Sequence, residues 1–136
     1  MGKLFFGLGI SLLMTAGAFA QDEKVAPFEA EMGGQVYLCG LKAQLADATK
    51  GPKQKALLED VKQCADKSRE RVKLLVKSEY QKYPEGDAAR DKIKAVYSAY
   101  LTYMSAALWG KDLTDSTEAL AFKEKVSDYK AEIEIR

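Results

Sequence analysis

The chain contains two cysteines, which lie symmetrically about a Gly51–Pro52 pair. Cys39 precedes Gly51 by 12 residues and Cys64 follows Pro52 by 12 residues, with apolar residues at helical spacing on both sides. Glycine is typical of the position that ends a helix, and proline of the first turn of the next. Two antiparallel helices joined here bring residues equidistant from the turn side by side. The sequence therefore predicts a helical hairpin closed by a Cys39–Cys64 disulfide. In the loop-entropy relation this disulfide stabilises the folded protein by roughly 3 kcal/mol.

The beginning of the chain has the layout of a secretory signal peptide. Lys3 supplies a positive charge, an apolar stretch follows from Leu4 to Met14, and the small residues Ala18 and Ala20 form a cleavage site. The apolar stretch is too short to span a membrane. We therefore expect residues 1–20 to be a signal peptide and residues 21–136 to be a single helical domain. The mature protein should be periplasmic or secreted, without stable membrane insertion, in an oxidising compartment where a disulfide persists.

Apolar residues repeat at spacings of three and four in four segments, which predicts four helices. The expected helices run from about Phe28 to Ala48, from Pro52 to about Tyr83, from Asp87 to near Trp109–Gly110, and from Asp115 onward. No strand-like alternation of useful length occurs. We expect an all-α fold, a small antiparallel up-down-up-down four-helix bundle. A three-helix core with an extra segment packed across it is the alternative.

The first helical segment has two unusual features. Gly33 and Gly34 interrupt its pattern, and we expect the helix to continue through them although each glycine costs roughly 1 kcal/mol relative to alanine. Leu38, Leu41 and Leu45 widen its apolar stripe. This width predicts that the helix is buried on two sides.

Two acidic residues are expected to start helices. Asp87 follows the Pro84–Gly86 break and is a good N-cap for the third helix. Asp115, with Glu118 three residues later, resembles a capping box in which aspartate replaces serine or threonine. The last helix is therefore predicted to begin after Asp115.

The charges balance overall but are unevenly distributed. Without Lys3, 20 basic residues face 20 acidic ones. Residues 21–49 carry a net charge of −3, residues 50–82 a net of +5, and residues 114–136 a net of −2. This alternation is most simply explained by complementarity within one bundle. Zero net charge, together with the expected compartment, disfavours nucleic acid as a partner.

The residue types exclude the commonest catalytic and metal sites. The chain has no histidine and no Cys-x-x-Cys motif, and no ordered calcium-loop pattern follows Glu85 and Asp87. A serine or cysteine nucleophile would lack its usual histidine base. Carboxylates such as Glu59 and Glu70 lie at helix-surface spacing from lysines. We therefore expect no cofactor, no metal and no enzymatic activity.

Two groups of side chains are candidates for binding. The first is a candidate interaction surface on the second helix and the bundle end it leads to, formed by Lys62, Arg69, Arg71, Lys73, Lys77, Tyr83 and Tyr103. The second is a candidate pocket lined by Tyr80, Tyr97, Tyr100 and Met104. Each group also has an ordinary structural interpretation. A basic helix face is commonly just solvated, and tyrosines at a bundle end commonly fill the core with their hydroxyls reaching water.

Two functions follow from these candidates. The first is a non-enzymatic protein that binds another protein in the cell envelope or outside the cell, such as an inhibitor, an immunity-type protein or an envelope accessory protein. The alternative is a small-ligand carrier with a cavity between the helices. A closed core with an exposed aromatic or charged patch favours the first, and a deep apolar pocket with converging hydroxyls favours the second.

Overall fold

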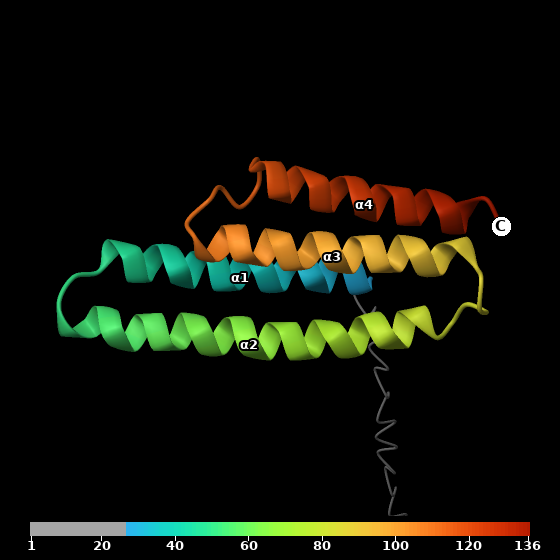
Figure 1. The fold of residues 1–136 in the computed structure, drawn as a ribbon. Helices are drawn as coiled ribbons and strands as arrows, with labels where there is room; N and C mark the ends of the chain where they lie inside the picture. Colours follow the sequence, from blue (N-terminus) through green and yellow to red (C-terminus); the bar gives the residue numbers. More distant parts are fainter. Residues whose placement is uncertain (1–26) are drawn as a thin grey trace, which may run out of the picture.

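The computed structural model describes residues 27–136, and the predicted signal peptide at residues 1–20 lies outside them. The helices of the described chain (Figure 1) are α1 (Phe28–Ala48), α2 (Pro52–Tyr80), α3 (Ala88–Leu108) and α4 (Thr117–Glu134). No strand occurs among residues 27–136. The all-α prediction is confirmed.

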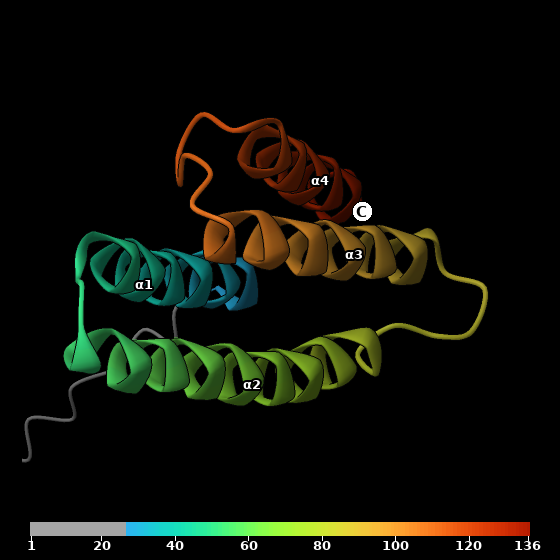
Figure 2. The same cartoon turned by 60° about the vertical axis from the view of Figure 1, so that its left-hand side comes forward.

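The helices form a small antiparallel bundle with the predicted up-down-up-down order (Figures 1 and 2). α1 packs against α2 and α3, while α4 packs mainly on α3. α1 and α3 run in the same direction through the centre, with α2 on one side and α4 on the other (Figure 2). α1 therefore has helix neighbours on only part of its circumference.

The predicted disulfide is present. Cys39 and Cys64 are bonded, with their Cα atoms 5.6 Å apart, and the bond joins α1 to α2. Cys39 is fully buried. Beyond the disulfide, the tip of the α1–α2 hairpin extends past the ends of α3 and α4 (Figures 1 and 2). Gly51 turns the chain there in the left-handed region, at φ 83°, and Pro52 begins α2.

Both ends of the loop between α2 and α3 follow from local chemistry. Asp87 caps α3 as predicted, because its carboxylate accepts a hydrogen bond from the Ala89 N–H at 2.8 Å. α2 ends at Tyr80, three residues before the predicted Tyr83. The chain tightens into turns there, and the Tyr83 N–H donates to the Tyr80 carbonyl. Pro84 disfavours helical backbone at Tyr83, so the helix ends early.

The predicted N-cap of α4, Asp115, is wrong by one residue. Ser116 is the N-cap, and its hydroxyl accepts a hydrogen bond from the Ala119 N–H at 3.2 Å. The Asp115 N–H instead donates to the Asp112 carboxylate at 2.7 Å. Asp112 therefore organises a turn that includes Asp115, and the cap passes to the next residue. Glu118 forms an ion pair with Lys111 rather than completing a capping box.

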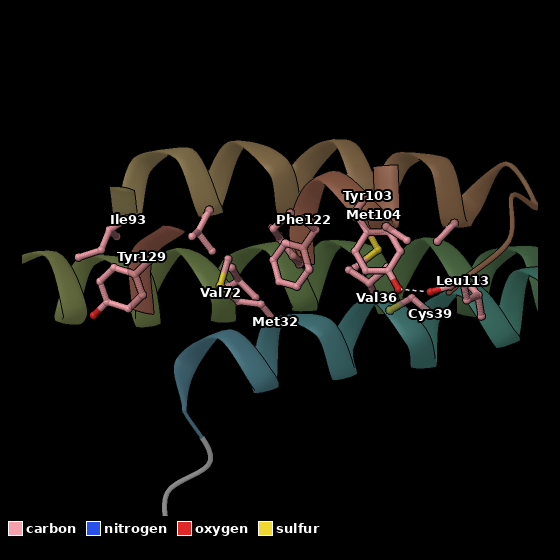
Figure 3. Packing of buried hydrophobic residues seen from close by; sticks show 14 of the residues in the cluster. Met32, Val36, Cys39, Val72, Ile93, Tyr103, Met104, Leu113, Phe122 and Tyr129 are labelled. Carbon is pink, nitrogen blue, oxygen red and sulfur yellow. Dashed lines mark hydrogen bonds between the residues drawn. The ribbon is translucent and has the colours of Figure 1, made fainter. Parts of the chain in front are cut away.

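Most of the residues expected on the inner faces form one main core. Figure 3 shows its side chains in a row along the bundle, from Ile93 and Tyr129 at one end to Leu113 at the other. α1 continues through Gly33 and Gly34 as predicted. A smaller apolar cluster holds the hairpin tip, and its members are Ala43, Ala46, Val61, Leu57 and Leu108.

The prediction that α1 is buried on two sides is wrong. Met32, Val36 and Cys39 are fully buried, but Leu38, Leu41 and Leu45 are exposed. The neighbours of α1 all lie on its inner half, because α4 covers α3 instead of wrapping around α1. The extra leucines therefore form a second apolar face that nothing within residues 27–136 covers.

Candidate protein-interaction surface

The candidate pocket residues belong to the packed interior and its edge. Tyr100 and Met104 are fully buried. The Tyr100 hydroxyl shares a 2.7 Å hydrogen bond with the Ser68 hydroxyl, and its ring stacks on that of Tyr97 with the centroids 6.2 Å apart. Burial raises the pKa of Tyr100. Tyr80 is half-buried beneath the guanidinium of Arg90, which lies 4.4 Å from its ring centroid.

These four residues lie apart from the most prominent hollows in the described surface. Three hollows are prominent there, one between α1 and α4, one at the bundle end near Phe28 and Tyr129, and one between α3 and α4. None of the three includes Tyr80, Tyr97, Tyr100 or Met104. The Tyr100 hydroxyl and the Met104 side chain, both candidates for ligand contact, are buried in the interior.

Tyr103, a candidate for the interaction surface, does not lie on the surface. Its residue is 6 % exposed, its ring packs on that of Phe122 with the centroids 5.6 Å apart, and its hydroxyl donates to the Leu113 carbonyl (Figure 3). Burial, followed by the nearby Asp112 charge, raises the pKa of Tyr103. The helical spacing placed this residue at the edge of the α3 stripe, but α4 and the loop before it cover that edge.

Tyr83 is also engaged within the molecule. Its hydroxyl lies 3.1 Å from that of Tyr129, and the Arg136 guanidinium lies 5.2 Å from its ring centroid. Tyr129 in turn donates to the Glu79 carboxylate at 2.6 Å, and burial raises the pKa of Tyr129. The aromatic end of the bundle is thus a hydrogen-bonded network that joins α2 to α4.

The basic residues of α2 lie on its outward side but do not form a uniform positive face. Lys62, Lys73 and Lys77 are exposed. Arg69 lies 3.9 Å from Asp66, and Arg71 forms an ion pair with Glu31 on α1. Two of the five basic residues are therefore paired with acidic ones, while Lys62, Lys73 and Lys77 form no salt bridge within the described residues. Exposed ion pairs of this kind contribute little to stability.

A surface that the sequence patterns did not assign lies on the outer side of α1. Tyr37, Leu38, Leu41 and Leu45 are exposed to 48 %, 51 %, 43 % and 56 %. Their spacing of three and four residues places them on one side of the helix. Exposed small residues extend the same side at both ends, so we define the α1 outer stripe as Gly34, Tyr37, Leu38, Leu41, Leu45 and Ala48.

The α1 outer stripe carries no charge. The charged side chains of α1 lie on its flanks, where neighbouring helices pair with most of them. Their partners are Lys130 for Glu29 at 3.2 Å, Arg71 for Glu31, and Asp60 for Lys42 at 2.7 Å. The stripe is thus an apolar strip bordered by ion pairs, a common layout of an interface core and its rim.

The stripe is large for an exposed apolar surface. Four large side chains, each about half exposed, present on the order of 400 Å², which is the size of patch that often marks a binding site on a monomer. Other exposed apolar side chains, such as Leu74, Trp109 and Leu120, lie on separate elements. Single exposed apolar residues are ordinary on protein surfaces, whereas four on one helix face are not.

The signal for this surface was present in the sequence. Leu38, Leu41 and Leu45 widen the apolar stripe of this helix, and the width alone predicted that they face the interior. The same helix has a complete inner stripe of Met32, Val36, Cys39, Ala43 and Ala46. A helix that is apolar on both faces needs cover on both, and the bundle covers only one.

Within residues 27–136, no group of three or more potential metal ligands lies close together. None of the four helices combines the length and apolar character that a membrane crossing requires. Comparisons with protein-family models, curated proteins and solved structures find no match for this chain.

Proposed function

We propose that this protein is an exported, non-enzymatic binding protein whose contact surface is the α1 outer stripe. The observation that carries the proposal is the continuous exposure of Tyr37, Leu38, Leu41 and Leu45 on a helix that is already packed on its inner side. Such a helix gains stability when another protein covers the outer side, since each half-exposed leucine loses further contact with water. Inhibitors, immunity-type proteins and envelope accessory proteins act through rigid surfaces of this kind.

Export is supported by the disulfide and by the signal-like beginning of the chain. A disulfide persists in the periplasm or outside the cell, and cytosolic thiols are usually kept reduced. The staple also makes α1 a firm binding element, because Cys39 anchors its inner face to α2. A pre-organised helix loses little conformational freedom on binding.

The stripe has the anchor spacing that helix partners use. Positions 34, 38, 41, 45 and 48 follow one another at intervals of four and three residues, as in the packing of one helix against another. A partner helix or groove can therefore interlock with the stripe over about four turns, of which the leucines span about two. The absence of histidine from the chain supports a binding role over acid-base catalysis.

Site-specific photo-crosslinking in the producing cell tests the contact surface. A photo-reactive residue in place of Leu41 should give a discrete protein–protein product. The matched control replaces Leu74, which is 69 % exposed on α2, and should give none. If positions 38, 41 and 45 all fail to crosslink to any protein, the stripe is not a contact surface.

Export is tested separately by the intact mass of the protein from the periplasmic fraction or the medium. The expected mature chain begins at Gln21, after the small residues of the cleavage site. A cytoplasmic protein that retains Met1 would contradict the export half of the proposal.

A further inference from the structure

We infer that the α1 outer stripe binds a second copy of this chain, with the two α1 helices antiparallel across a two-fold axis near Leu41. This pairing rests on the proposed binding role of the stripe and names its partner. It makes one isologous interface, in which the same surface is used on both copies.

The order of side chains along the stripe is nearly symmetric about Leu41. Tyr37 lies four residues before Leu41 and Leu45 four residues after it, while Gly34 and Ala48 lie seven residues before and after. An antiparallel pairing therefore places Tyr37 opposite Leu45 of the other copy, and Gly34 opposite Ala48. Large apolar side chains meet around the axis and small residues occupy the ends, which gives an apolar centre with an open rim.

The charges around the stripe distinguish the antiparallel from the parallel arrangement. The N-terminal part of α1 carries Glu29 and Glu31 and, from residue 27 to residue 41, no basic residue. The opposite end adjoins the hairpin tip, whose Lys50, Lys53 and Lys55 form no salt bridge within the described residues.

Glu31 lies ten residues before Leu41, so the antiparallel copy brings the region of Lys50 and Gly51 beside it. Glu29 and Glu31 are already paired with Lys130 and Arg71 within each copy, so the main contrast lies at the other end of the stripe, where a parallel pairing would set the lysines of the two hairpin tips against each other. At physiological salt these charges are screened within about 8 Å, so they select the orientation more than they strengthen the complex.

The size of the stripe predicts a dimer of modest affinity. Two stripes of about 400 Å² each, with their rims, reach roughly 1,000 Å², which is the lower end of specific interfaces. Dissociation in the micromolar range is therefore expected, and it should vary with protein concentration.

Analytical ultracentrifugation of the mature protein over a range from micromolar to several hundred micromolar tests the pairing. The wild type should pass from one to two copies per particle. Leu41→Glu places two carboxylates together at the axis and should raise the dissociation constant at least about 100-fold. Leu74→Glu, the same change at an exposed position of α2, should leave the dimer unchanged. Because Leu41 is exposed, circular dichroism should show both variants folded.

Cysteine pairs test the orientation. A mixture of Tyr37→Cys and Leu45→Cys proteins should form a mixed disulfide faster than either protein forms one with itself. A parallel dimer would give the reverse order, with each variant linking preferentially to its own kind. Cys39 is fully buried in its native bond, so it does not compete readily.

The outcomes separate this inference from the proposed function. Dimerisation that is lost in Leu41→Glu, with the mixed disulfide preferred, supports both. A protein that stays monomeric throughout, or whose dimer ignores Leu41→Glu or shows the parallel preference, overturns the antiparallel pairing. The proposed function then stands if a photo-crosslink from position 38, 41 or 45 contains another protein, and falls with the pairing if none of the three positions crosslinks.

Discussion

The two helical hairpins of this bundle are held together by different means. The α1–α2 hairpin has a covalent link between Cys39 and Cys64, and its tip is packed by small and medium residues such as Ala43, Ala46 and Val61. The α3–α4 hairpin has no covalent link and is packed by large rings. Tyr103 and Phe122 meet there, and Tyr129 closes the other end against Phe28 with the ring centroids 5.3 Å apart.

The difference shows how a small domain distributes its sources of stability. Large aromatic side chains bury much surface per residue, so the α3–α4 hairpin is stabilised in its folded state. The α1–α2 tip extends past the other helices and buries little apolar surface. The disulfide contributes to the stability of this hairpin instead, because it restricts the conformations of the unfolded chain. The ion pair between Asp87, before α3, and Arg136, after α4, is a weaker polar counterpart of the disulfide. The aromatic packing, the disulfide and this ion pair can each be tested separately.

The largest effect is expected from Phe122→Ala. Phe122 is buried against Tyr103 and contributes to the main core, so its truncation should lower the free energy of unfolding by about 3–5 kcal/mol. Val61→Ala truncates the largest buried side chain at the α1–α2 tip and removes far fewer atoms, so it should cost only about 1–2 kcal/mol. Urea denaturation followed by circular dichroism measures both. Equal costs would mean that the hairpins do not differ in packing as described.

Removal of the disulfide is expected to come next. The double variant Cys39→Ala with Cys64→Ala should lose about 3 kcal/mol of unfolding free energy, because its unfolded chain regains the freedom of the closed loop. Helix content should change little, since the large core side chains of α3 and α4 are retained. Hydrogen exchange should accelerate most between residues 43 and 61, at the hairpin tip. A loss spread evenly over all four helices would contradict a local role for the staple.

The smallest effect concerns the Asp87–Arg136 pair and depends on pH. The hydrogen bond from Arg136, followed by that from the Ala89 N–H, lowers the pKa of Asp87 from 3.8 to about 2. A lowered pKa in the folded state means that the stabilisation is complete above about pH 4 and is lost as the pH falls through 2. Asp87→Asn should therefore melt a few degrees below the wild type at pH 5, and the gap should close between pH 4 and pH 2.

Arg136→Ala separates the two causes of this pKa shift. It keeps the helix cap on Ala89 but removes the guanidinium, so Asp87 should titrate between about 2 and its usual value. Thermal melting at several pH values and the carboxyl chemical shift of Asp87 measure the two quantities. If the difference in melting temperature between the wild type and Asp87→Asn stays constant down to pH 2, Asp87 is not stabilised as an anion in the folded state.

Local signals in the sequence predicted most of the fold. Proline and glycine at 51–52 and the N-cap aspartate at 87 mark helix boundaries through their own backbone and side-chain chemistry, so no distant residue is needed. The disulfide followed from the same local turn, because antiparallel geometry makes sequence distance a guide to spatial distance. The failure at Asp115 was local too, since the Asp112 carboxylate accepts from the N–H groups of Thr114 and Asp115 and holds Asp115 in the preceding turn, so Ser116 caps the helix.

The candidate site was harder to predict because periodicity identifies apolar faces but not their neighbours. Tyr103 and Leu41 are both residues at the margin of an apolar stripe. α4 covers the first and no described element covers the second. The spacing in the sequence predicted the reverse, with Tyr103 on the surface and Leu41 in the interior.

The sequence alone determined the helices, their antiparallel order and the cysteine pair, because each depends on interactions within a turn or between residues equidistant from one. Only the tertiary structure decided which helices touch. At Gly40 an added Cβ would lie 3.2 Å from the Cβ of Ala107 and collide with Leu113, so α1 and α3 approach closely there. The inner side of α1 therefore packs closely against α3. It leaves the outer leucines of α1 in solvent, since a helix can be covered only where another element is placed beside it.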